Sequence, residues 1–232
     1  MAARNTDIAI VGLGLHFPGA ANAQEYWQRL KEAKDLSEQP GADRWPINAE
    51  KHLSKTPSAD ALRCLRGYYL HDLPTPEEEG LPKGTDPVFT LSLSTAKQAL
   101  EDCSNINRQR TGVVMAAIAL PTDTTSALSE AVLGNDFEQR LRHKLAAAFP
   151  QKSAALNVSS ADSQALPVDA TTAAINTNPV GLPAQLIAGK LGLGLGGYTL
   201  DAACASSLVA VALACDELRA HRADAMLAGG LS

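Results

Sequence analysis

One junction late in the chain constrains the fold most. A short apolar run from Tyr198 to Ala202 follows the glycine-rich turn Gly192–Gly197 and passes directly into a helical pattern that begins at about Cys204. The run predicts a buried strand. The apolar residues after it recur at helical spacing and predict a helix with one buried face: Leu208, Val211, Ala212, Cys215 and Leu218.

Other apolar runs repeat this arrangement of strand followed by helix. They predict buried strands at 8–11, 112–118 and 225–228, the last of them ended by Gly229 and Gly230. Uniformly apolar strands that alternate with helices indicate an α/β fold, in which a mostly parallel sheet is covered by helices on both faces.

The segments between these runs predict helices and loops. Asn22 followed by Glu25 resembles a capping box and opens a predicted helix through about Lys34. Further helices are expected at 91–103, 126–133, 137–149 and 181–191, a surface excursion with at most short helices at 36–86, and a mobile loop at 150–169.

The composition excludes some classes of function. With 20 Lys and Arg against 25 Asp and Glu, the net charge is −5, which argues against a protein that wraps nucleic acid. No apolar run reaches the roughly 20 residues that cross a bilayer. The first residues lack the charged-then-apolar pattern of a signal peptide. We therefore expect a cytoplasmic protein with neither nucleic acid nor membrane among its partners.

The four cysteines, Cys64, Cys103, Cys204 and Cys215, show no C-x-x-C pairing, so no metal site is expected. Cys204 and Cys215 are assigned to one helix, where they would lie roughly 16 Å apart. That separation is too large for a disulfide. Reduced thiols in a reducing compartment are the simpler interpretation.

Cys204 is the candidate catalytic residue. At a helix N-terminus, unpaired backbone N–H groups and the positive end of the helix dipole stabilise a thiolate. The same N–H groups can donate to the oxyanion that forms when a thioester is attacked. The alternative is a small buried core residue, as expected for Cys215, and most free cysteines are of that kind. Small neighbours would leave room for an acyl group: Ala203, Ala205 and Ser206.

Three polar residues beside Cys204 are given structural roles. Asp201 could orient the turn by accepting backbone N–H bonds. Ser206 and Ser207 lie near the predicted helix start, where capping by the side chain is the expected role.

The run from Asp201 to Leu208, D-A-A-C-A-S-S-L, resembles the active-site signature of β-ketoacyl synthases, D-T-A-C-S-S-S-L. The resemblance extends from about Asp7 to Ser232 and is nearest to modular or iterative polyketide and polyunsaturated-fatty-acid synthases. Other segments that carry it are Ile8–Gly14, Phe17–Gly19, Tyr26-Trp27, Asp43–Trp45, Leu100–Asp102, Ala214–Arg219 and Ala225–Gly230.

The resemblance implies a thiolase-like fold of two similar α/β halves, with residues 1–232 as the N-terminal half and the second half absent. It implies an acyltransferase that first moves an acyl chain to Cys204 and then condenses it with a decarboxylating malonyl unit. Both substrates would arrive as thioesters on the phosphopantetheine of an acyl carrier protein. No metal or redox cofactor is implied. A homodimer is expected, with the remaining half and further synthase domains as additional partners.

The sequence also departs from the family pattern. The family's two histidines lie in H-G-T-G-T-like and K-x-x-x-G-H-like motifs of its second half, and neither motif occurs here. Ala202 replaces the usual threonine, and the residues 88–90 replace the polar part of a D-P-Q-Q-R-like segment after Asp86-Pro87. The five histidines have no such context: His16, His52, His71, His143 and His221.

We therefore expect the chain alone to accept an acyl group without completing the condensation. The alternative is a truncated or split half that acts as a non-catalytic scaffold or dimer partner. Cys204 argues against one type of such partner, the chain-length-factor relatives, which have the synthase fold but lack the nucleophilic cysteine.

Three competing enzyme classes are disfavoured by their motifs. Gly12-Leu13-Gly14 after an apolar run suggests dinucleotide binding, but Phe17 replaces the third glycine and Pro18-Gly19 follows, so a tight strand-to-loop turn is preferred. A hydrolase elbow would need glycines around its nucleophile, and Ala202 and Ser206 stand there instead. A thiolase would share the fold, but C-A-S-S favours the synthase.

Overall fold

The computed structural model describes residues 7–41, 48–59, 61–118, 120, 122–149 and 169–231. The chain divides into two compact units. Unit 1 holds Met1–Ala9, Pro74–Leu93 and Asn105–Ser232, and unit 2 holds Ile10–Leu73 and Ser94–Ser104. Within the described ranges, no helix is both long and apolar enough to cross a bilayer.

A parallel three-stranded sheet forms the centre of unit 1. β1 (Thr111–Ala117) is the middle strand, with β2 (Gly197–Leu200) on one side and β3 (Ala225–Leu231) on the other. Every residue of β1 is buried, as the apolar run that follows Thr111 predicts for a central parallel strand. Ala116 lies opposite both Leu200 and Gly230, so the carboxyl ends of all three strands meet at one edge.

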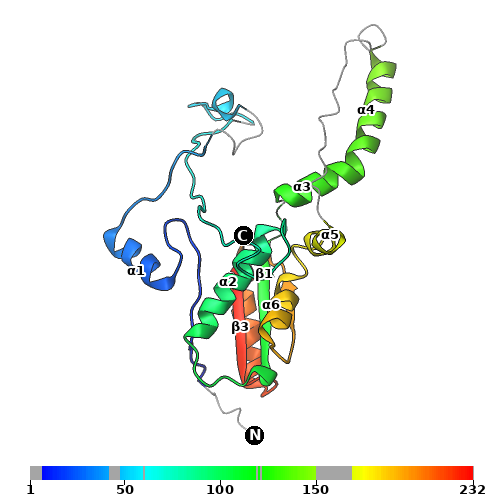
Figure 1. Cartoon of the computed structure of the whole chain (residues 1–232). Coiled ribbons are helices and arrows are strands. Elements are labelled where there is room, and N and C mark those ends of the chain that lie inside the picture. The colour runs from blue at the N-terminus through cyan, green and yellow to red at the C-terminus, as the bar shows by residue number, and fades with distance from the viewer. Residues whose placement is uncertain are drawn as a thin grey trace. The chain divides into compact units, whose positions relative to one another are not determined.

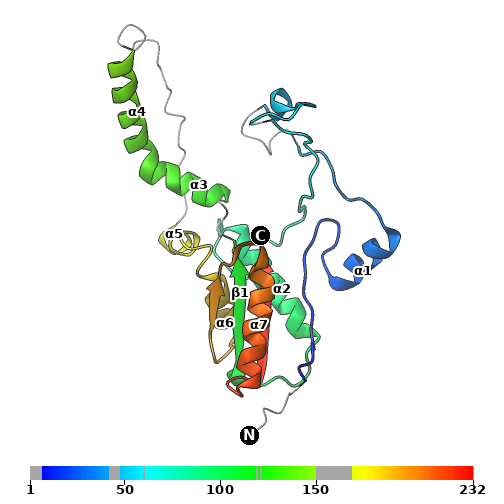
Figure 2. The same ribbon diagram turned by 180° about the vertical axis from the view of Figure 1, so that it is seen from behind.

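Helices cover both faces of this sheet. α7 (Ser206–Arg219) packs against β1 and β3, and α6 (Pro183–Leu191) packs against β1 and β2. Figure 1 shows α6 in front of the sheet, and Figure 2, from behind, shows α7 on the other face. The expected α/β architecture is therefore confirmed.

An apolar cluster in unit 1 joins three helices. Phe89 and Leu93 from α2 (Pro87–Glu101) are fully buried beside Leu81. Partly buried side chains from α2, α5 (Ala170–Asn176), α6 and the segment before α6 complete the cluster: Val88, Ile175, Leu182, Leu186 and Leu191. The apolar residues that follow Asp86-Pro87 are thus core residues.

Asp86, which is buried, joins the starts of two helices to α5. Its carboxylate accepts hydrogen bonds from the backbone N–H of Val88 (3.0 Å), in the first turn of α2, and from the hydroxyl of Thr122. Thr122 is the N-cap of α3 (Asp123–Ser129). The backbone N–H of Asp86 donates to Asn176 Oδ1 of α5 at 2.8 Å. Because each partner lies on a different element, Asp86 fixes how these elements meet within unit 1.

The capping box predicted in unit 2 is confirmed with a small change. α1 (Ala23–Glu32) begins after Asn22, whose side chain accepts from the backbone N–H of Glu25 at 2.9 Å. The Glu25 carboxylate accepts from the backbone N–H of Ala21 rather than from the backbone N–H of the N-cap. The hydrogen bond from the Ala21 backbone, with another from the side-chain amide of Asn22, holds the pKa of Glu25 below its ordinary value. In the described part of 36–86, one short 3₁₀ turn is present, Ala49–His52.

The predicted strand at 8–11 is wrong. The structure assigns no strand there, and Ile10 is 90% exposed. In unit 2 the following residues lie against α2 so closely that a Cβ on Gly12 or Gly14 would come within 1.9 Å of a helix carbonyl oxygen. These glycines therefore permit close contact with a helix, which accounts for their spacing without a phosphate-binding role. Apolarity predicted the strand, but it cannot say whether a partner strand is available.

Other boundaries shifted as well. β3 continues through Gly229 and Gly230 instead of ending before them. The helices expected at 126–133 and 137–149 are α3, a π-helical segment Glu130–Gly134 and α4 (Asn135–Ala148) in direct succession. α5 was not predicted, although its N-cap Asp169 accepts from Thr171 and Thr172. The rest of the predicted mobile loop, 150–168, lies outside the described residues.

Candidate active site

The candidate nucleophile lies where the sequence places it. Cys204 is the middle residue of a 3₁₀ turn, Ala203–Ala205, between the end of β2 and the start of α7. Cys204 is exposed, whereas Cys215 within α7 is partly buried. Because β2 ends at the edge where all three strands end, Cys204 lies at the carboxyl edge of the sheet. In open α/β sheets, this edge is where ligands bind.

The residue before the nucleophile has a left-handed backbone. Ala203 has φ 50°, and its N–H donates to Asp201 Oδ1 at 2.8 Å. The expectation that Asp201 accepts a backbone N–H is confirmed. An alanine in this region costs roughly 1 kcal/mol or more, and such strain concentrates at functional sites. Contacts within the fold therefore keep Ala203, just before Cys204, in a backbone conformation that alanine disfavours.

Ser206 does not cap α7, contrary to the sequence prediction. Ala205 is the N-cap, and Ser206 is the first helical residue. The Ser206 hydroxyl accepts from Ala202 N–H at 2.8 Å and donates to Ala203 C=O at 2.7 Å. The residue is 5% exposed. Its side chain therefore bonds backward across the turn, to groups that precede Cys204.

The buried face of α7 also differs from the predicted one. The helix buries Ser206, Ala210 and Ala214, while Leu208 is 74% exposed and Val211 is 47% exposed. The helical period is as predicted, but the small residues face the sheet. The reason is visible at Gly230 of β3, where an added Cβ would lie 2.9 Å from Ser207 Cβ. Helix and strand backbones approach too closely there for large side chains.

The start of α7 leaves hydrogen-bond donors available. Within the described residues, the N-cap Ala205 makes no side-chain cap bond to the first turn. The first N–H groups of a helix have no carbonyl partner inside that helix. The N–H groups of Ala205 and Ser206 already donate to the carbonyls of Ala202 and Ala203. The remaining N–H groups of the first turn of α7 are the ones that can donate to an oxyanion formed next to Cys204.

The far end of α7 is fixed to the sheet. Arg110, just before β1, forms an ion pair with Asp224 (2.8 Å) and donates to the carbonyl of His221 (2.9 Å). Arg222 donates two hydrogen bonds to Glu217, and this pairing lowers the pKa of the Glu217 carboxyl. The helix that follows the candidate nucleophile is thus anchored at its other end by these contacts.

Other candidate groups lie elsewhere. His221 follows α7, whose 14 residues span about 20 Å, so it cannot reach Cys204 as a base. His71 pairs with Glu38 in unit 2, and His143 belongs to α4. Among the residues the structure describes, no cluster of three or more His, Cys, Asp or Glu could hold a metal ion.

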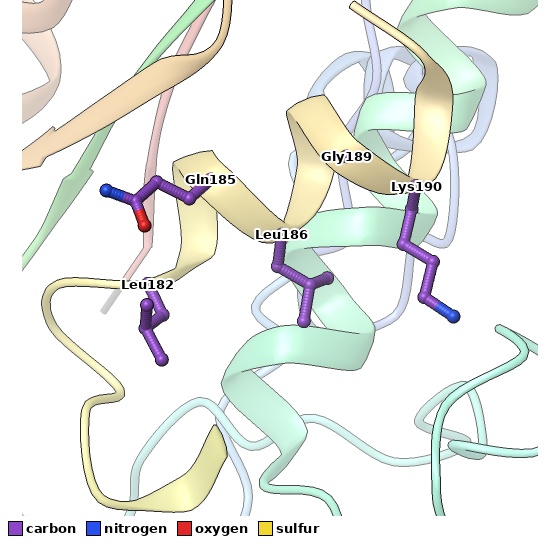
Figure 3. A pocket seen from close by; sticks show the side chains of 5 residues that line it. All are labelled: Leu182, Gln185, Leu186, Gly189 and Lys190. Carbon is purple, nitrogen blue, oxygen red and sulfur yellow. The ribbon is translucent and has the colours of Figure 1, made fainter. Parts of the chain in front are cut away.

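A shallow hollow of about 490 Å³ lies on the outer side of α6 (Figure 3). It is lined by Leu182, Gln185, Leu186, Gly189 and Lys190. Lys190 extends its ammonium group away from the leucines and donates to Gly80 C=O at 2.6 Å. Since α6 and α7 cover opposite faces of the sheet, this hollow does not adjoin the helix that follows Cys204.

The strain at Ala203 gives a testable prediction. Ala203→Val should lower the free energy of unfolding by about 1–2 kcal/mol, because a β-branched residue resists a positive φ more strongly than alanine does. Ala203→Gly should leave stability unchanged or raise it, because glycine adopts this backbone without strain. Urea unfolding of the three proteins measures both effects. Equal stabilities for the valine and glycine variants would contradict the strained turn.

The match to a family model decides the family. The model described as "Beta-ketoacyl synthase, N-terminal domain" matches residues 5–232. The chain belongs to the β-ketoacyl synthase family. The resemblance carried by the run around Cys204 is thereby confirmed.

Relatives of this β-ketoacyl synthase chain are parts of large synthases. It is 28% identical over 240 residues to a polyunsaturated fatty acid synthase polypeptide of Thraustochytrium sp., covering 99% of this chain and 11% of that protein. It is also 28% identical over 239 residues to a phenolphthiocerol/phthiocerol polyketide synthase polypeptide of Mycobacterium tuberculosis, covering 97% and 11%. The chain thus spans about a tenth of the length of these relatives.

Solved ketosynthase structures share the fold. A PfaC keto synthase–chain length factor structure matches with a TM-score of 0.69 and 27% identity, over 97% of this chain and 24% of that one. An oxazolomycin ketosynthase domain from Streptomyces albus matches with a TM-score of 0.66 and 20% identity, over 96% and 35%. The expected thiolase-like fold is confirmed.

Proposed function

We propose that this chain supplies the acyl-accepting nucleophile of a polyketide or polyunsaturated-fatty-acid synthase, and that the nucleophile is Cys204. The observation that carries the proposal is the exposed thiol on a strained turn, between the end of β2 and the uncapped start of α7. A buried packing cysteine would need neither the exposure nor the strain. Membership of the β-ketoacyl synthase family supports the same role.

In the first step, the Cys204 thiolate attacks the carbonyl carbon of an acyl thioester carried on the phosphopantetheine of an acyl carrier protein. The new carbon–sulfur bond forms first and gives a tetrahedral oxyanion. The bond to phosphopantetheine then breaks, and the carrier thiolate leaves and takes up a proton. The N–H groups at the start of α7 are placed to donate to the oxyanion between these two events. The small residues beside Cys204 leave space for the acyl chain.

In the second step, a malonyl thioester loses carbon dioxide and the resulting enolate attacks the acyl group on Cys204. A carbon–carbon bond forms, the Cys204 thiolate is released, and the β-ketoacyl product stays on the carrier. The electrons of the broken carbon–carbon bond drive this step, so no metal or redox cofactor takes part. We assign the oxyanion-stabilising histidines of this step to synthase residues outside 1–232, and this chain by itself to the first step.

The partners follow from the same proposal. An acyl carrier protein delivers both substrates, and the remaining half of the synthase domain covers apolar residues left exposed on α7, such as Leu208 and Val211. A homodimer is supported by β2, which lies at an edge of the described sheet with Tyr198 exposed, because an open edge can pair with a second copy. Four free cysteines suit a reducing, cytoplasmic setting.

A burst experiment tests the first step. The chain is mixed with an excess of acyl-loaded carrier protein, and free carrier is followed by intact-mass spectrometry. Because the acyl-enzyme persists without a malonyl unit, we expect a burst of one carrier deacylated per chain, followed by slow hydrolysis. Deacylation without a burst, or no deacylation above the rate in buffer, would contradict the proposal and favour the scaffold alternative.

A further inference from the structure

We propose that Ser206 is a positioning residue that clamps the turn carrying Cys204, and this inference rests on the proposed function of Cys204. The Ser206 hydroxyl bonds to two successive residues on the far side of the nucleophile, accepting from Ala202 N–H and donating to Ala203 C=O. One side chain thus connects the residue at the start of α7 to the two residues that precede Cys204.

The clamp acts on the strained residue that precedes Cys204. Ala203 has a left-handed backbone, which alanine adopts at a cost. The backbone N–H of Ser206 also donates to the Ala203 carbonyl. The Ser206 hydroxyl adds a second hydrogen bond to the same carbonyl, and this bond opposes relaxation of Ala203 toward negative φ and rotation of the next peptide, which carries Cys204. Asp201 holds the N–H of Ala203, and Ser206 holds its C=O. The two side chains therefore fix both peptide groups of the strained residue.

The clamp is itself fixed relative to the sheet. Ser206 is buried and begins α7, so its Cα moves only with the helix. The next residue, Ser207, lies against the backbone of β3 at Gly230. The Ser206 hydroxyl therefore links the turn that carries the thiol to α7 and, through α7, to the sheet. This link adds to the one made by the backbone of the three-residue turn.

The chemistry requires a hydroxyl, because this group must accept one hydrogen bond and donate another. Alanine can do neither. Threonine keeps both functions, and cysteine keeps the shape with weaker hydrogen bonds. Ser207 offers a matched control: it is adjacent and exposed, and within the described residues its side chain has no hydrogen bond assigned to it.

The experiment measures acylation of Cys204 by the N-acetylcysteamine thioester of butyrate, as a function of thioester concentration. Ser206→Ala should lower the maximal rate about tenfold or more, because a misplaced nucleophile loses attack geometry. The half-saturating concentration should stay unchanged. Ser206→Thr should restore most of the rate, and Ser207→Ala should match the wild type. Urea unfolding shows that the variants are folded.

The outcomes separate the two proposals. If wild-type Cys204 is acylated and Ser206→Ala acylates it at the same maximal rate, the clamp is overturned while the function of Cys204 stands. If wild-type Cys204 takes no acyl group, the proposed function itself fails. Should Ser206→Ala not fold, Ser206→Cys is measured in its place, with the new thiol resolved by peptide sequencing. A wild-type rate for that folded variant would overturn the clamp.

Discussion

Cys204→Ala is expected to abolish acyl uptake by the chain. The rate of deacylation of an acyl carrier protein should fall at least about a thousandfold, to the background in buffer, because loss of a nucleophile removes the covalent step entirely. The fold should survive, since Cys204 is exposed and lies in a turn. The measurement is the burst of free carrier thiol, together with the intact mass of the chain after removal of the carrier.

The other cysteines supply the controls for this result. Cys64 is exposed like Cys204, and Cys215 is partly buried within α7. Cys64→Ala and Cys215→Ala should both retain the full burst. An acyl adduct that persists in Cys204→Ala would contradict the assignment, whichever residue carries it.

Phe89→Ala is expected to lower the free energy of unfolding by about 3–5 kcal/mol, the range typical of a fully buried phenylalanine replaced by alanine. Phe89 is 0% exposed and belongs to the cluster with Leu81 and Leu93. Partly buried residues of α5 and α6 pack against the same cluster, so the cavity would lie where three helices meet. Urea unfolding followed by circular dichroism measures the loss.

A matched variant separates packing from local backbone effects. Phe89→Leu keeps most of the apolar volume and should cost less than about 1.5 kcal/mol. Its exposed counterpart is Phe137 on α4, which is 65% exposed, and Phe137→Ala should change stability by less than about 0.5 kcal/mol. Equal losses for Phe89→Ala and Phe137→Ala would contradict the burial of Phe89.

The sequence predicts the parts of the fold that depend on one segment alone. The strand at Thr111–Ala117, the helix that begins after Asn22 and the helix that ends at Leu191 follow from nearby apolar runs, caps and glycines. The strand prediction at 8–11 is wrong because a strand needs a neighbouring strand to pair with, and an apolar run does not show whether one is present. α5 was missed because its seven residues are too few to show a clear helical period.

The candidate site shows the same division. The position of Cys204 at a turn between strand and helix is local, and it was predicted. Which face of α7 meets the sheet depends on Gly230, in a strand that follows later in the chain, so the pattern of large apolar residues selected the wrong face. The role of Ser206 depends on the left-handed backbone at Ala203. Because this residue is an alanine and not a glycine, the sequence does not indicate that conformation.

The most direct test of the central claim is to locate the acyl group on the wild-type chain. After reaction with acyl-loaded carrier protein, trypsin releases Cys204 and Cys215 on one peptide, because the chain has no lysine or arginine between Lys190 and Arg219. Fragmentation between the two cysteines assigns the added mass. We expect one acyl group per chain, on Cys204. An acyl group on Cys215 or Cys64, or none on this peptide, would contradict the account.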